Sequence, residues 1–253
     1  MLSFTVITYL NFGVAVNYEL LVFIFLATIT GYNFIKYAAI AKFKHLSLSP
    51  QLRAIQIFSF LVFIGLIPTL FFQSLEVLIS SCILGFFTLL YALPLSGRRR
   101  NLREIPGLKI YIIALVVAGV TVILPLIETE IFPTRDHIID FFQRTIIAVV
   151  LILPFEIRDM NKDIAQLSTI PQRLGVSRTK QLGYVLIALF VLTEFLKREI
   201  DITYAISLAG LGVLSSLFLK NSTVDQDKYF ASFWVEAVPM FWIGIFYLVD
   251  LII

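Results

Sequence analysis

Three carboxylates near the middle of the chain have a spacing that could hold a divalent cation. Glu156, Asp159 and Asp163 follow the apolar run "TIIAVVLILP" at positions i, i+3 and i+7, so one continuous helix would carry them on one face. Such a stripe needs solvent, counter-charges or a cation, and Mg²⁺ is usually held by one or two carboxylates together with substrate phosphates. The alternative is a solvated helix end at which Arg158 and Lys162 neutralise the acids.

The chain around these residues has the composition of a membrane protein. Of its 253 residues 59% are hydrophobic and 15% are charged, and the mean hydropathy is +0.92. Soluble proteins carry about 25% charged residues, and a helix needs about 20 apolar residues to cross a bilayer. We therefore predict an all-α, polytopic membrane protein, with a single transmembrane helical domain over residues 1–253. The nine expected spans are Leu2–Val16, Leu20–Ala41, Ala54–Phe72, Leu75–Leu95, Leu108–Ile127, His137–Phe155, Thr179–Leu196, Ile202–Leu219 and Phe230–Ile253.

The distribution of lysine and arginine predicts the orientation of these spans. Most of the 20 basic residues lie after the second, fourth, sixth and eighth spans or at adjoining helix ends. Arg135, Arg144, Lys197 and Arg198 lie toward the opposite face. Because basic residues concentrate on the cytoplasmic side of a membrane, we expect a protein of the cell inner membrane with a cytoplasmic N-terminus and an outside C-terminus.

Several classes of function find no support in the sequence. Cys82 is the single cysteine and cannot form an internal disulfide, while His45 and His137 fall at opposite membrane faces, which disfavours a histidine metal site. The net charge of +3 follows from the basic loops, and no nucleic-acid-binding pattern is present. Charged residues gathered at one face also argue against a transporter, whose site usually lies near the midplane.

Two segments carry a resemblance to a known family. "EIRDMNKDIAQLSTIPQRLG" resembles the second aspartate-rich motif of UbiA-type intramembrane prenyltransferases, D-x-x-x-D followed by T-L-P-x-x-x-G. Asp159 and Asp163 match the two aspartates, and Pro171 and Gly175 match the trailing part. Glu156 stands where many members carry another aspartate. "YALPLSGRRRNLREIPGLK", which begins at Tyr91, resembles the Y-S-x-P-P-x-R-x-K-R segment of the family.

The resemblance implies a fold, a reaction and a set of site residues. It implies helices around a central cavity open to the cytoplasmic side, and transfer of a prenyl group from a prenyl diphosphate to an aromatic or lipid acceptor in the membrane. Mg²⁺ and basic side chains would neutralise the charge that grows on the departing diphosphate. The metal ligands would be Glu156, Asp159 and Asp163, the catalytic residues Lys36, Asp159 and Asp163, and the substrate-binding residues Asn33, Tyr91, Arg98, Arg99, Arg100, Arg103 and Arg158.

The first aspartate-rich motif of the family, N-D-x-x-D-x-x-x-D, is degenerate in "GYNFIKYAAIAKFKH". Asn33 matches the leading asparagine, but no carboxylate follows it, and Phe34, Lys36 and Ile40 stand there instead. Lys36 could contact the diphosphate as a point charge in place of one Mg²⁺, or pair with Asp159 or Asp163 and close the pocket. The second alternative describes a catalytically inactive relative that binds a lipid or a protein partner.

Two further charged residues lie inside predicted spans. Arg144 is in the sixth span and Glu236 is in the last. Ionisable residues at such depths contact substrate, pair with one another inside the bundle, or extend toward an interface.

Overall fold

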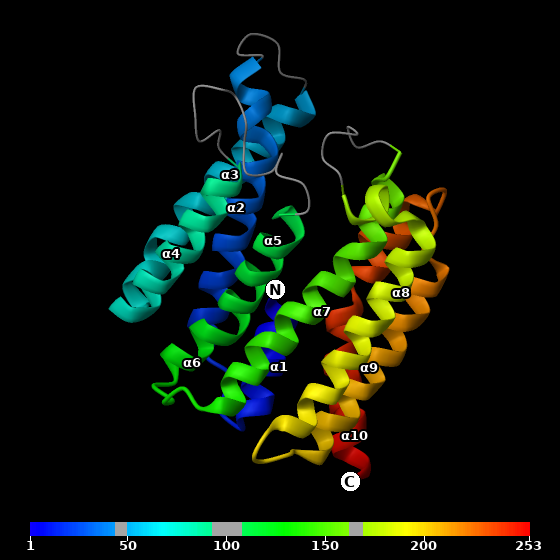
Figure 1. Ribbon diagram of the computed structural model, residues 1–253. Coiled ribbons are helices and arrows are strands. Elements are labelled where there is room, and N and C mark those ends of the chain that lie inside the picture. The colour runs from blue at the N-terminus through cyan, green and yellow to red at the C-terminus, as the bar shows by residue number, and fades with distance from the viewer. Residues whose placement is uncertain (44–49, 93–107, 162–168) are drawn as a thin grey trace.

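The computed structural model describes residues 1–43, 50–92, 108–161 and 169–253, with side chains placed for 1–34, 53–89, 108–161 and 169–253. Every regular element in these ranges is helical, which confirms the all-α prediction (Figure 1). The α-helices are α1 (Leu2–Phe12), α2 (Tyr18–Phe43), α3 (Pro50–Thr69), α4 (Leu75–Ala92), α5 (Leu108–Ala118), α6 (Leu124–Glu128), α7 (Arg135–Asp159), α8 (Ile170–Leu192), α9 (Ile202–Asn221) and α10 (Val238–Ile252). Short 3₁₀ segments are η1 (Leu70–Phe72) and η5 (Thr193–Leu196), and π-helical segments are η3 (Gly119–Ile123) and η6 (Phe230–Val235).

Five helical segments are long and apolar enough to cross a membrane. They are Arg53–Phe72, Leu108–Glu128, Arg135–Asp159, Ile170–Leu196 and Ile202–Asn221. Leu2–Phe12, Tyr18–Phe34, Leu75–Leu89 and Val238–Ile252 are apolar helices of shorter length. The membrane character of the chain is therefore supported, whereas the count of nine spans stays a prediction.

The helices contact one another in an order that closes into a ring. Along this ring α2 contacts α4, then α5, α7, α8, α9, α10 and α1 follow, and α1 contacts α2 again. Helix α3 lies outside the ring against α2. Figure 1 shows α2, α3 and α4 on one side, α7, α8 and α9 on the other, and α5 between them. The central cavity stays a prediction, with which this order of helix contacts is compatible.

Charged side chains from α7 and from the connection between α8 and α9 form a buried network. The Lys197 Nζ lies 2.8 Å from the Asp140 Oδ1 and 2.8 Å from the Glu194 Oε2, and all three side chains are at most 6% exposed. The Gln143 Nε2 donates to the same Glu194 oxygen at 2.9 Å. The Asp136 carboxylate accepts from the backbone N–H groups that follow Lys197. Asp136, Asp140 and Gln143 are spaced i, i+4 and i+7, so one face of α7 holds this connection.

Arg144 joins α1 to α7 and α10. Its Nη1 donates to the Phe4 carbonyl at 2.9 Å and its Nη2 to the Thr8 Oγ1 at 3.2 Å. Its Cζ lies 4.6 Å from the centre of the Phe4 ring and 4.9 Å from that of Trp242, within the range of cation–π attraction. The structure therefore shows Arg144 held inside the bundle by a backbone carbonyl, a hydroxyl and two aromatic rings.

Removal of Lys197 should destabilise the fold strongly. Lys197→Met leaves two buried carboxylates without their counter-charge, and loss of one partner of a buried ion pair costs about 3–5 kcal/mol. We expect a decrease of this size in the free energy of unfolding, measured by denaturant titration in detergent. The triple variant Lys197→Met/Asp140→Leu/Glu194→Leu removes the uncompensated charges and should be much closer to wild type. Equal stability of wild type and Lys197→Met would contradict the importance of the network.

Candidate functional site

The candidate site lies at the C-terminal end of α7, called the α7 end below and defined by Glu156, Arg158 and Asp159. Helix α7 ends at Asp159, and Met160 and Asn161 form a turn. The continuous helical face predicted for three carboxylates therefore extends, within the described residues, over Glu156 and Asp159 alone. Asp163 lies outside the described residues.

Glu156 forms a buried ion pair with a lysine from α5. The Lys109 Nζ lies 2.7 Å from the Glu156 Oε1, and the exposed fraction is 2% for the glutamate side chain and 32% for the lysine side chain. A buried carboxylate needs such a partner because water does not solvate it. The pair joins α5 to α7 and engages an oxygen that the predicted magnesium site would use.

Arg158 forms a two-point ion pair with its neighbour Asp159. The Nε donates to Oδ1 and the Nη2 donates to Oδ2, both at 2.9 Å. The side chains are 23% and 32% exposed. The guanidinium also lies 5.3 Å from the centre of the Phe155 ring and within electrostatic range of Glu236. Glu236 thus belongs to the surroundings of the α7 end.

The described carboxylates differ in how well they suit a metal ion. Glu156 is buried against an ammonium group and fits poorly, and Asp159 is more exposed but both of its oxygens accept from Arg158. Among the described side chains, no group of three or more His, Cys, Asp or Glu residues gathers to hold a metal. Magnesium therefore stays a prediction, with Asp159 as its described ligand.

The other predicted site residues are placed to different degrees. Asn33 lies half-buried on α2. Lys36 and Tyr91 lie on α2 and α4, but their side chains are outside the described part. The C-terminal ends of α2, α4 and α7 and the first turn of α5 lie at the same end of the bundle (Figure 1). Arg98, Arg99, Arg100 and Arg103 fall outside the described residues.

The segment after the carboxylates forms a capped helix start followed by a break. Thr169 is the N-cap of α8, and its backbone N–H donates to the Gln172 Oε1 at 3.0 Å. The Gln172 Nε2 donates to the Met160 carbonyl at 3.1 Å, which ties the start of α8 to the end of α7. Pro171 lies in the first turn, where a missing N–H costs nothing. Gly175, at φ 77° and ψ 163°, then interrupts the helix.

Sequence reasoning missed the pairing of Lys109 with Glu156, although Lys109 is the last residue of the quoted segment "YALPLSGRRRNLREIPGLK" and one of the basic residues used for the orientation. A signal was nevertheless present. Consecutive spans run in opposite directions, so the start of the fifth span and the end of the sixth must lie at the same membrane face. Lys109 at the start of the fifth span and Glu156 at the end of the sixth could have been paired on this ground.

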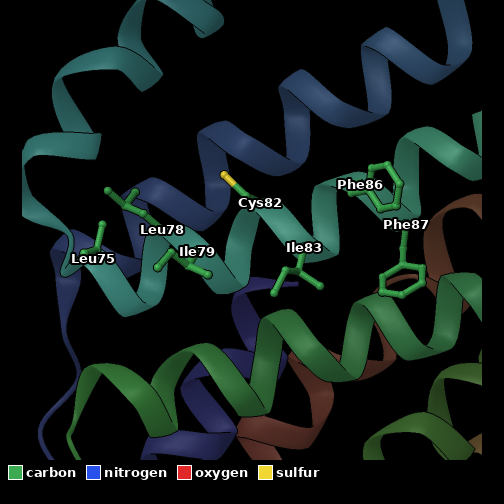
Figure 2. Close-up of a pocket in the computed structure, with 7 residues that line it drawn as sticks. All are labelled: Leu75, Leu78, Ile79, Cys82, Ile83, Phe86 and Phe87. Carbon is green, nitrogen blue, oxygen red and sulfur yellow. The ribbon is translucent and has the colours of Figure 1, made fainter.

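A separate apolar groove lies on α4. Figure 2 shows its lining: Leu75, Leu78, Ile79, Cys82, Ile83, Phe86 and Phe87. All of these side chains come from one helix and none is charged, so the groove suits hydrocarbon and not an anionic group.

No family model, curated protein or solved structure matches the chain. The likeness to UbiA-type prenyltransferases accordingly rests on the two quoted segments.

A side chain at Gly175 should strain the backbone. Its φ and ψ fall in a region that is almost restricted to glycine and costs other residues about 1–3 kcal/mol. A Cβ built there meets no atom within 4 Å, so Gly175→Ala should lower the free energy of unfolding through strain and not through a clash. Gly244→Ala in α10 is the matched control, because its Cβ also meets nothing within 4 Å and its φ is not positive. Equal stability of the two variants in denaturant titrations would refute this explanation.

Proposed function

We propose that the protein is a UbiA-like membrane prenyltransferase, which transfers a prenyl group from a prenyl diphosphate to an aromatic or lipid acceptor. The observation that carries the proposal is the gathering of charges at the α7 end. There Lys109 from α5 meets Glu156, beside the ion pair of Arg158 and Asp159. Charged groups at the end of an apolar helical bundle suit a substrate with an anionic head and a hydrocarbon tail.

The reaction breaks the bond between the allylic carbon and the diphosphate oxygen, and the electron pair leaves with oxygen. The prenyl cation is captured by an electron-rich acceptor, which then loses a proton. Mg²⁺, when bound by Asp159 and Asp163, would neutralise charge on the departing diphosphate. Lys36, Arg158 and the remaining predicted substrate-binding residues would bind the same group, and Glu156 would support the site through Lys109.

A second candidate function is non-catalytic binding of an isoprenoid lipid or a membrane protein partner. One observation favours it: both described carboxylates of the motif are already neutralised within the chain, by Lys109 and by Arg158. Loss of the acids after Asn33 points in the same direction. Mg²⁺ discriminates the two functions, because a lipid-binding bundle has no need of it.

The proposed location is the cell inner membrane, with the α7 end toward the cytoplasm. The C-terminus lies at the opposite end of the bundle from the α7 end (Figure 1), which agrees with a C-terminus outside. That the α7 end faces the cytoplasm is inferred from the distribution of lysine and arginine along the sequence and not from the fold.

Loss of Asp163 should abolish transfer. For Asp163→Ala we expect release of pyrophosphate from geranylgeranyl diphosphate to fall about 100-fold or more, the size of effect seen when one group that stabilises transition-state charge is removed. The assay uses purified protein in detergent with Mg²⁺ and a membrane lipid extract as the source of acceptor. Asp225→Ala is the control, because Asp225 is an exposed acid in the connection between α9 and α10. Full turnover by folded Asp163→Ala would show that the assignment is wrong.

A further inference from the structure

Two short segments of the chain share the pattern Thr-x-x-Gln and form the same hydrogen bond. They are "TIPQ" (Thr169–Gln172), where α8 begins, and "TVDQ" (Thr223–Gln226), in the connection after α9. In each segment the backbone N–H of the threonine donates to the Oε1 of the glutamine three residues later, at 3.0 Å in the first and 3.2 Å in the second. The amide is thus held through its oxygen, while its NH₂ group carries two donors.

Both amides donate to carbonyl groups at the C-terminal end of α7. The Gln226 Nε2 donates to the Pro154 carbonyl at 3.1 Å, and the Gln172 Nε2 donates to the Met160 carbonyl at 3.1 Å. Pro154 precedes the α7 end by two residues, and Met160 follows it directly. The α7 end therefore lies between two carbonyls that are held from two different connections. Gln172 and Gln226 are called the glutamine clamps below.

The local sequence of α7 weakens its last turns. Pro154 lies inside the helix and lacks the N–H that would donate to the carbonyl four residues earlier. Met160, the residue after the helix, has φ −51° and ψ −40°, so α7 does not end in the left-handed glycine that caps many helices. The last four carbonyls of a helix have no partner inside it, and helix ends fray. The glutamine clamps supply donors on both sides of this weak segment.

Arg158 and Asp159 lie on the turn between the clamps. Their side chains form the two-point ion pair at 2.9 Å, and both are partly exposed. Because they are the last two residues of α7, fraying would move both charges together. A functional site must be held within about 0.5 Å of its productive geometry, so a site at this helix end requires the end to be fixed.

We propose that Gln226 and Gln172 are positioning residues, which hold the last turn of α7 through its flanking carbonyls and thereby fix Arg158 and Asp159 for the substrate. This inference rests on the proposed function and deepens it, because that function assigns Arg158 to the binding of the diphosphate. Neither glutamine contacts the substrate in this proposal, since each acts through the backbone of α7.

Loss of either clamp should let the end of α7 open more often. Gln226→Met and Gln172→Met keep the length of the side chain and remove the amide donor without adding a charge. In each variant we expect the backbone amides of residues 155–161 to exchange with deuterium about fivefold faster than in wild type, since the loss of one hydrogen bond shifts an opening equilibrium by about this factor. The measurement is hydrogen–deuterium exchange of the full chain in detergent, followed by mass spectrometry of its peptides.

A third variant separates the bond to α7 from the bond inside the turn. Gln226→Glu keeps an oxygen for the Thr223 N–H but has no donor for the Pro154 carbonyl. We expect residues 155–161 to exchange as fast in this variant as in Gln226→Met. Exchange at the wild-type rate would show that the contact with α7 does not hold the helix end, and would overturn the inference.

Gln73→Met is the matched control. The Gln73 Nε2 donates to the Thr69 carbonyl at 3.4 Å, in the connection between α3 and α4. This connection lies at the end of the bundle opposite to the α7 end (Figure 1). The variant loses the same amide group and should leave both the exchange of residues 155–161 and the kinetic constants as in wild type.

The clamps should also affect the binding of substrate. In the pyrophosphate-release assay with Mg²⁺ and the membrane lipid extract, we expect the KM for geranylgeranyl diphosphate to rise about threefold or more in Gln226→Met and Gln172→Met, with a smaller change in kcat. A misplaced Arg158 weakens the bound ground state and the transition state alike, and such a loss raises KM. A variant that is merely less well folded contains less active protein, which lowers the apparent kcat and leaves KM unchanged.

The outcomes separate the glutamine clamps from the proposed function. With an active wild type, exchange at the wild-type rate or a wild-type KM in both methionine variants would overturn the positioning role and leave the proposed function intact. If wild type releases no pyrophosphate with Mg²⁺, the proposed function fails, and the role of the clamps in the reaction fails with it.

Discussion

An ionisable side chain inside an apolar bundle must find its partner within the protein, because neither hydrocarbon nor bulk water is available to solvate it. In this chain the partners come from different helices. Glu156 pairs with Lys109 across α7 and α5, Asp140 and Glu194 share Lys197, and Arg144 reaches the first helix. These contacts join α7 to α5, to the connection after α8 and to α1, so several neighbours of α7 are held to it through polar side chains.

The ion pairs at the two ends of α7 differ in how far they are exposed. Near its N-terminus the side chains of Asp140, Glu194 and Lys197 are at most 6% exposed, and their contribution is to hold the connection between α8 and α9. At the α7 end the acids are paired with cations that remain partly exposed. A closed network stabilises the fold, whereas partly exposed cations can also meet a ligand.

The helical class and the apolar blocks could be predicted because they depend on composition over about 20 neighbouring residues. The shared face of Glu156 and Asp159 followed from helical spacing in the same way. Partner choice could not be predicted so easily, since Lys197 and Asp140 are brought together only by packing of distant segments. The end of α7 at Asp159 was also missed. The Met160 carbonyl in the turn that follows accepts from Gln172 in the first turn of α8, a contact between segments that helical spacing does not indicate.

The network around Lys197 also bears on how the protein is made. Asp140 lies in α7, which is long and apolar enough to cross a membrane, but its counter-charge, Lys197, is synthesised only after α8 is complete. An isolated α7 would carry a carboxylate without a partner among lipids, which is costly. We therefore expect α7 and α8 to enter the membrane together as one helical hairpin, which is completed when Lys197 is synthesised and pairs with Asp140.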